Sequence, residues 1–133
     1  MRVLGVHVSE AGTEWCRLIG DDCAGGVYDG DGLRAVIDDV ICRGLAGSDA
    51  DPLIIVIGGD VQPNHKTDLL QLEDTTPGVE VAIYSKWDTG AAIRAASRAT
   101  WSVAKTMRAR GLLGPEAPTG RAAALTLDMA GRI

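Results

Sequence analysis

The sequence is poor in aromatic residues and has no long apolar run, and both features narrow what the protein can be. Among its 133 residues there is no Phe, only 4% are aromatic, and 17 are Gly. A core must therefore be built from small and aliphatic side chains. No apolar run approaches the ~20 residues that a membrane-spanning helix needs, and acidic residues and Trp come too early for a signal peptide. We expect a globular, cytoplasmic protein with no membrane partner.

Cysteine is also scarce. Cys16, Cys23 and Cys42 are odd in number, show no C-x-x-C spacing and are accompanied by no paired histidines. This pattern favours free thiols in a reducing compartment over a disulfide framework or a zinc motif. A chain of this length is expected to form one domain, spanning residues 1–133.

Positive charge is scarce over most of the chain and concentrated in one part of it. The net charge is −5, and residues 1–85 hold 5 Lys and Arg against 15 Asp and Glu. Residues 86–110 have the opposite net charge, because they contain six basic residues and a single acid, Asp88. Total charge is therefore a poor guide to partners, and the basic segment is the part to consider for an anionic ligand.

The first twenty residues predict the centre of a sheet. Val3–Val8 is apolar on both faces, which is typical of an interior strand. A turn containing Gly12 leads into Glu14–Gly20, whose alternating pattern predicts the second strand of a hairpin. Further strands are predicted at Val27–Tyr28, Leu53–Ile57 and Val79–Tyr84.

Helical periodicity is clearest after Asp31, which we expect to cap a helix over Leu33–Leu45. Two more helices are predicted, from Asp88 to Arg110 and over Thr119–Arg132, whereas Asp60–Pro77 is expected to be mostly loop. The order of elements predicts an α/β domain, in which helices cover the faces of a mixed five-stranded sheet.

This order resembles the ribonuclease H-like fold. The resemblance rests on Val3-Leu-Gly-Val6 with Gly12 in the following turn, a returning strand, a helix, a buried strand and an Ala-rich last helix. Within that fold, the chain is most similar to the RuvC and YqgF (RuvX) type of small resolvase and nuclease domains. The resemblance implies nucleic-acid cleavage by two metal ions held by carboxylates.

The carboxylates implied by this resemblance are largely absent. The family has an acid on its first strand where this chain has His7. A second is implied near Gly58, where Asp60 follows two residues later. The last acids are implied at the start of the C-terminal helix, where Pro118-Thr-Gly-Arg121 has none. We therefore expect a catalytically degenerate relative with no resident cofactor, which binds branched or single-stranded nucleic acid or a protein partner.

Four dispersed residues remain candidates for a metal or catalytic site. Imidazole and carboxylate groups suit transition metals, so His7, Asp60 and His65 are candidate ligands, and Glu10 joins His7 and Asp60 as a catalytic candidate. The alternative reading of His7 is a histidine hydrogen-bonded within the core. An active nuclease with displaced ligands would use Glu10, Asp60 and either Asp88 or His7, together with Mg²⁺ or Mn²⁺.

The predicted basic helix carries the clearest signal for a ligand. At 3.6 residues per turn, its basic side chains and one Trp fall in a single stripe, as phosphate contact and base stacking would require. The stripe consists of Arg94, Arg98, Trp101, Lys105 and Arg108. Basic faces are common on helices, so the stripe also fits a solvated outer face, or one that pairs with the acidic remainder of the chain or with a second subunit. A third hypothesis is an assembly subunit or homodimer, packed through the small residues of Gly90–Ala99 and Ala122–Ala130.

Overall fold

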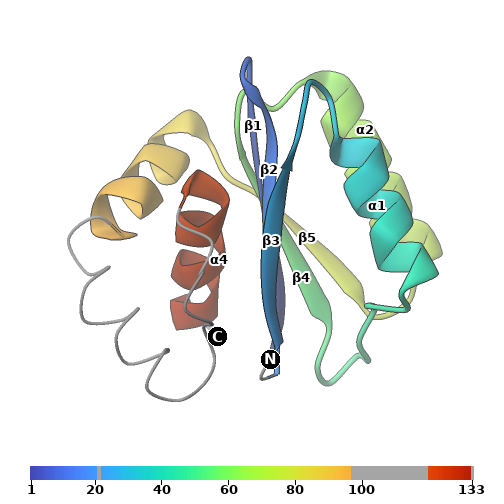
Figure 1. The fold of residues 1–133 in the computed structure, drawn as a ribbon. Helices are drawn as coiled ribbons and strands as arrows, with labels where there is room; N and C mark the ends of the chain where they lie inside the picture. The colour runs from blue at the N-terminus through green and yellow to red at the C-terminus, as the bar shows by residue number, and fades with distance from the viewer. Residues whose placement is uncertain (21, 97–119, 133) are drawn as a thin grey trace.

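The computed structural model describes residues 1–20, 22–96 and 120–132 and is organised around a mixed sheet (Figure 1). The sheet has five strands in the order β3-β2-β1-β4-β5. β1 pairs antiparallel with β2 and parallel with β4, and β4 pairs parallel with β5. The α/β class and the central place of the first strand are thus confirmed. The strands are β1 (Arg2–Ser9), β2 (Gly12–Ile19), β3 (Asp22–Tyr28), β4 (Leu53–Gly59) and β5 (Val79–Ile83).

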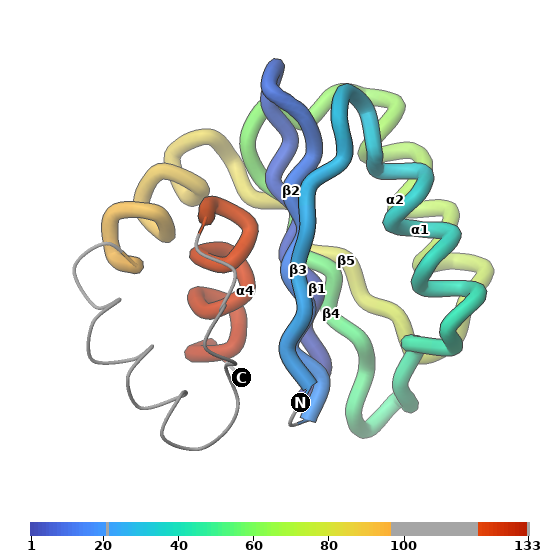
Figure 2. The backbone as a smooth tube through the Cα atoms, in the orientation of Figure 1, coloured from blue at the N-terminus to red at the C-terminus, as the bar shows by residue number. Residues whose placement is uncertain are grey.

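Helices cover both faces of the sheet. α1 (Leu33–Cys42) and α2 (Pro63–Thr75) lie on one face, and α4 (Arg121–Arg132) and the helical residues 86–96 lie on the other (Figures 1 and 2). None of the helices in the described ranges is long and apolar enough to cross a membrane.

The alternation of side chains along β1 divides the core in two. Leu4, Val6 and Val8 pack with α1 and α2 in the larger apolar cluster. Val3 packs on the opposite face, in a smaller cluster that includes Leu125 of α4. Since successive side chains of a strand point to opposite faces, Gly5 and His7 lie on the α4 face with Val3.

α4 packs closely against β1 because Gly5 has no side chain. A Cβ placed at Gly5 would collide with the Thr126 hydroxyl and the Ala122 carbonyl. Thr126 Oγ1 donates hydrogen bonds to Cys16 O and Ala122 O, each at 2.9 Å. The small residues of α4 thus serve this contact, and Ala122 and Ala124 are buried within the protein itself.

The prediction that Asp60–Pro77 is mostly loop was wrong, because α2 occupies Pro63–Thr75. Pro63 sits in the first turn, where its missing N–H costs nothing. Just before it, the Gln62 N–H donates to His65 Nδ1 at 3.0 Å as part of a capping box. The buried side chains of α2 are only His65, Leu69 and Leu72, so its apolar stripe is too narrow to stand out in the sequence.

Several element boundaries also differ from the predictions, and the helix expected over Leu33–Leu45 ends at Cys42. β3 begins at Asp22, well before Val27, because Gly25 and Gly26 continue the strand and do not form a turn. The helix expected to start at Asp88 starts at residue 86, since Ser85 Oγ accepts the Asp88 N–H at 3.0 Å and caps it. The predicted continuation of this helix over residues 97–110, and Thr119 at the start of the last helix, lie outside the described residues.

Candidate functional site at the carboxyl ends of β1 and β4

His7 lies on the α4 face of the central strand, between two neighbours in the sheet. Its register partners are Glu14 of β2 and Gly58 of β4. The side chain is 5% exposed. A Cβ on Gly59 would lie 2.9 Å from His7 Nε2, and Gly59 has a φ of 91°. Only glycine therefore suits this position, both for its backbone conformation and for the space that the imidazole takes.

Three charged side chains surround His7. Burial is the largest influence on its pKa, which is lowered from 6.5, and the positive charge of Arg121 lowers it further. Glu14 and Asp60 act in the opposite direction but do not outweigh burial. The structure thus brings His7, Asp60 and the start of α4 together, and the imidazole is neutral at pH 7.

The Glu14 carboxylate caps α4. Its Oε2 accepts hydrogen bonds from the backbone N–H groups of Arg121, at 3.0 Å, and Ala122, at 3.4 Å. These are among the donors that a helix leaves unpaired in its first turn, and a negative charge there also complements the helix dipole. Glu14 is therefore already engaged in holding α4 on the sheet.

Asp60 follows β4 and is paired with the start of the next helix on the α4 face. Its Oδ1 lies 3.5 Å from Lys86 Nζ, and its N–H donates to Val8 O at 2.8 Å. Thr89 Oγ1 accepts the Gly59 N–H at 3.3 Å and donates to Ser85 O at 2.8 Å. The helix that begins at residue 86 is therefore fixed to the carboxyl end of β4.

The proposed metal ligands do not gather in one place. Glu10 lies exposed in the turn between β1 and β2, and His65 lies on α2, on the other face of the sheet. Among residues 1–20, 22–96 and 120–132, no three His, Cys, Asp or Glu side chains are placed to hold a metal ion. Since Mg²⁺ and Mn²⁺ prefer several oxygen ligands, this set of donors does not fit either ion.

His65 has a structural role that the sequence did not indicate. Its Nδ1 accepts the Gln62 N–H, and its Nε2 lies 3.1 Å from Asp31 Oδ2, although the N–H is poorly aligned with that oxygen. Burial alone would raise the pKa of Asp31, but the contacts with His65 and the Leu33 N–H outweigh it, and the pKa is lowered. The His65–Asp31 contact links α2 to the beginning of α1.

Of the predicted basic stripe, Arg94 lies in the described part of the chain, and Arg98, Trp101, Lys105 and Arg108 lie outside it. The Arg94 guanidinium lies over the ring of Trp87, 5.5 Å from its centroid. Trp87 is 76% exposed. Trp87 was missed because the helix was predicted to begin at Asp88. Trp87 lies two helical turns before Arg94, and this spacing could have placed both side chains on one face of the helix.

The fold and the site together define an α/β domain in which basic and aromatic side chains border the carboxyl end of the central strands. A comparison with family models gave no match, and comparisons with curated proteins and with solved structures gave no significant match.

Proposed function

We propose that this chain is a ribonuclease H-like domain of the RuvC and YqgF type that has lost its catalytic carboxylates and binds nucleic acid. The order of elements that suggested this kinship is supported by the central position of β1 and by its pairing with β2 and β4. A first strand at the margin of the sheet would have argued against it.

The arrangement around His7 favours binding over metal-dependent cleavage. An imidazole stands where the family has its first acid, and Arg121 stands at the start of the last helix. The two nearest carboxylates are already engaged, since Glu14 caps α4 and Asp60 is paired with Lys86. An exposed cation such as Arg121 can contact phosphate directly, without a bridging metal ion.

The observation that carries the proposal is the exposed Trp87 with Arg94 stacked over it, one residue from Lys86. Nucleic-acid-binding surfaces combine cations that contact phosphates with aromatic rings that stack on bases. Residues 1–85 are strongly acidic, so a polyanion is attracted to the described residues that follow them, where Lys86, Arg94 and Arg121 lie.

The proposal is tested by fluorescence anisotropy with a labelled four-way DNA junction and a labelled single strand, over a range of salt concentrations. Arg94→Ala and Arg121→Ala should each weaken binding several-fold and reduce the salt slope by about one. Arg34→Ala is the matched control, since Arg34 is exposed on α1, on the opposite side of the sheet, and should leave affinity unchanged. No binding at low salt would contradict the proposal.

The same samples test the nuclease alternative. Incubation of the junction with Mg²⁺ or Mn²⁺ should leave the DNA intact. Cleavage that Asp60→Ala abolishes would show an active enzyme with displaced ligands and would overturn the assignment of a degenerate site.

A further inference from the structure

The two edge strands of the sheet differ in whether a side chain hydrogen-bonds to their outward-facing backbone groups. At the β5 edge, the Val81 N–H donates to Glu73 Oε2 of α2 at 2.6 Å, so a side chain occupies a backbone donor of that strand. β3 forms the other edge, and within the described residues no side chain caps its backbone. Unpaired edge strands are templates for another chain, and proteins usually block them. Among the described residues, β3 is therefore the edge left open to pairing.

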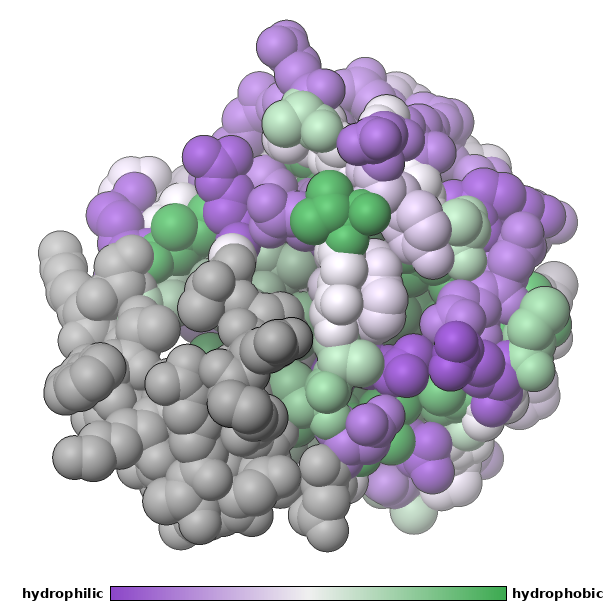
Figure 3. Space-filling model, in the orientation of Figure 1, coloured by the Kyte–Doolittle hydropathy of each residue, from purple (hydrophilic) through white to green (hydrophobic). Residues whose placement is uncertain are grey.

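A pocket lies beside this open edge. Its volume is about 290 Å³, and it is lined by Cys23, Gly25 and Val27 of β3 and by Ala122, Ala123 and Glu14. The register with β2 places Cys23, Gly25 and Val27 on the α4 face of β3. Gly25, which has no side chain, leaves the space open, and Val27 is 65% exposed. Figure 3 shows pale and green atoms running down the molecule over β3.

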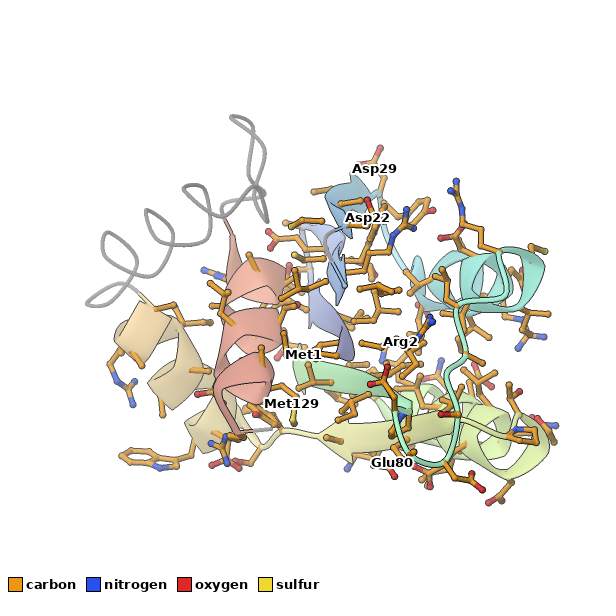
Figure 4. The ribbon with its side chains drawn as sticks, turned by 90° about the horizontal axis from the view of Figure 1, so that it is seen from below. Met1, Arg2, Asp22, Asp29, Glu80 and Met129 are labelled. Atoms are coloured by element: carbon orange, nitrogen blue, oxygen red, sulfur yellow. The ribbon has the colours of Figure 1, made fainter. Side chains whose placement is uncertain are left out.

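The charges around β3 indicate what could pair with it. Asp22 begins the strand and has one carboxylate oxygen 3.5 Å from Arg17 Nε. Asp29 follows the end of the strand, and both acids lie at the β3 margin of the sheet, opposite Glu80 at the β5 margin (Figure 4). Two copies pairing antiparallel through β3 would bring Asp22 of one close to Asp29 of the other, and like charges across a strand pair are destabilising. An added strand with a basic residue near each end would instead complement the negative charges of Asp22 and Asp29.

We propose that β3 accepts an extended basic peptide of a partner protein as a sixth strand of the sheet. Backbone hydrogen bonds to the β3 edge hold the peptide, and one of its apolar side chains enters the pocket over Gly25. Its Lys or Arg residues pair with Asp22 and Asp29. Strand addition of this kind derives affinity from the main chain and specificity from pockets for alternate side chains. The pocket adjoins the start of α4, because Glu14 lines it and also caps Arg121, but strand addition does not depend on the proposed nucleic-acid binding.

The test uses two synthetic peptides of alternating Thr and Val, each about ten residues long, a length suited to an edge strand. One carries two Lys seven residues apart, to match Asp22 and Asp29, and the other carries Glu at the same two places. NMR amide shifts locate the peptide, and anisotropy measures its affinity. We expect the Lys peptide to shift β3 amides and leave β5 amides unchanged, and the Glu peptide to bind roughly tenfold more weakly.

The variant Gly25→Leu tests the role of the pocket. Its leucine side chain should fill the pocket and weaken binding of the Lys peptide roughly fivefold. Glu80→Leu, on the other edge strand, is the matched control and should have no effect. The comparison of the two peptides on the unmodified protein stands even if Gly25→Leu fails to fold. Equal binding of both peptides, shifts away from β3, no binding at millimolar peptide, or a dimer whose β3 amides are already protected would each overturn the proposal.

Discussion

His7 is neutral in the folded protein because burial lowers its pKa below the ordinary 6.5. In the unfolded chain the imidazole regains its ordinary pKa and takes up a proton first as the pH falls. The contribution of His7 to stability is therefore complete above about pH 6.5 and is lost as the pH falls from there toward the folded pKa. The loss is at most about 1.4 kcal/mol per pH unit.

His7→Gln should reduce this pH dependence. Urea unfolding of both proteins at pH 7.5 and pH 5.5 gives the change in free energy of unfolding between the two conditions. That change should be smaller in His7→Gln than in the unmodified protein, whatever the absolute stability of the variant. An equal change in both would show that His7 is not a source of the pH dependence.

Glu14→Ala tests the capping of α4 by a side chain that comes from β2. Removing the carboxylate leaves the Arg121 and Ala122 N–H groups without their acceptor and should cost about 1 kcal/mol of unfolding free energy. Glu10→Ala, in the exposed hairpin turn, removes the same charge four residues away and should change stability by less than about 0.5 kcal/mol. If both variants lose the same free energy of unfolding, Glu14 has no specific role in capping α4.

These residues show how far the sequence could predict the site. His7 and Asp60 were identified because an imidazole within an apolar strand and an acid after a buried one stand out locally. Glu14 was not identified, because its partner Arg121 is distant in the chain and no local pattern reports such a contact. Sequence patterns thus found the strand ends that build the site but not the side chains that meet there.

At the scale of elements, the packing of α4 on β1 depends on a single missing side chain. Gly5→Ala should cost about 1–3 kcal/mol, because its Cβ would press on Thr126 and on the Ala122 carbonyl. Gly131→Ala, near the end of α4, meets nothing within 4 Å and should gain about 0.5–1 kcal/mol from helix propensity. Thermal unfolding of the pair measures both effects, and a neutral Gly5→Ala would mean that α4 can shift freely on the sheet.

The elements also differ in how visible they are in the sequence. β1 and β4 were predicted because both faces are buried, which gives continuous apolar runs. α2 was missed because it buries few side chains. Its N-terminus is also capped by Gln62 and His65, which are not among the residue types preferred at helix N-caps. The sequence reports burial better than it reports local hydrogen bonding.

At the scale of the whole molecule, β1 lies in the interior of the sheet, with six of its eight residues buried. It has strands on both sides and helices over both faces (Figure 2). Amides in such a position exchange with solvent only through extensive unfolding, whereas edge strands exchange through local opening. The strand order therefore predicts a gradient of protection that falls from β1 and β4 toward the two margins of the sheet.

Native-state hydrogen exchange should show that gradient together with a difference between the margins. β1 and β4 amides should exchange slowest, and β3 amides fastest among the strands, because no described side chain caps the β3 edge. The Val81 amide of β5 should be slower than the β3 amides, since Glu73 accepts its hydrogen. Glu73→Gln, which keeps an acceptor, should preserve this protection, whereas Glu73→Ala should remove it. Amides of β3 as slow as those of β1 would mean that this edge is already covered, leaving no place for an added strand.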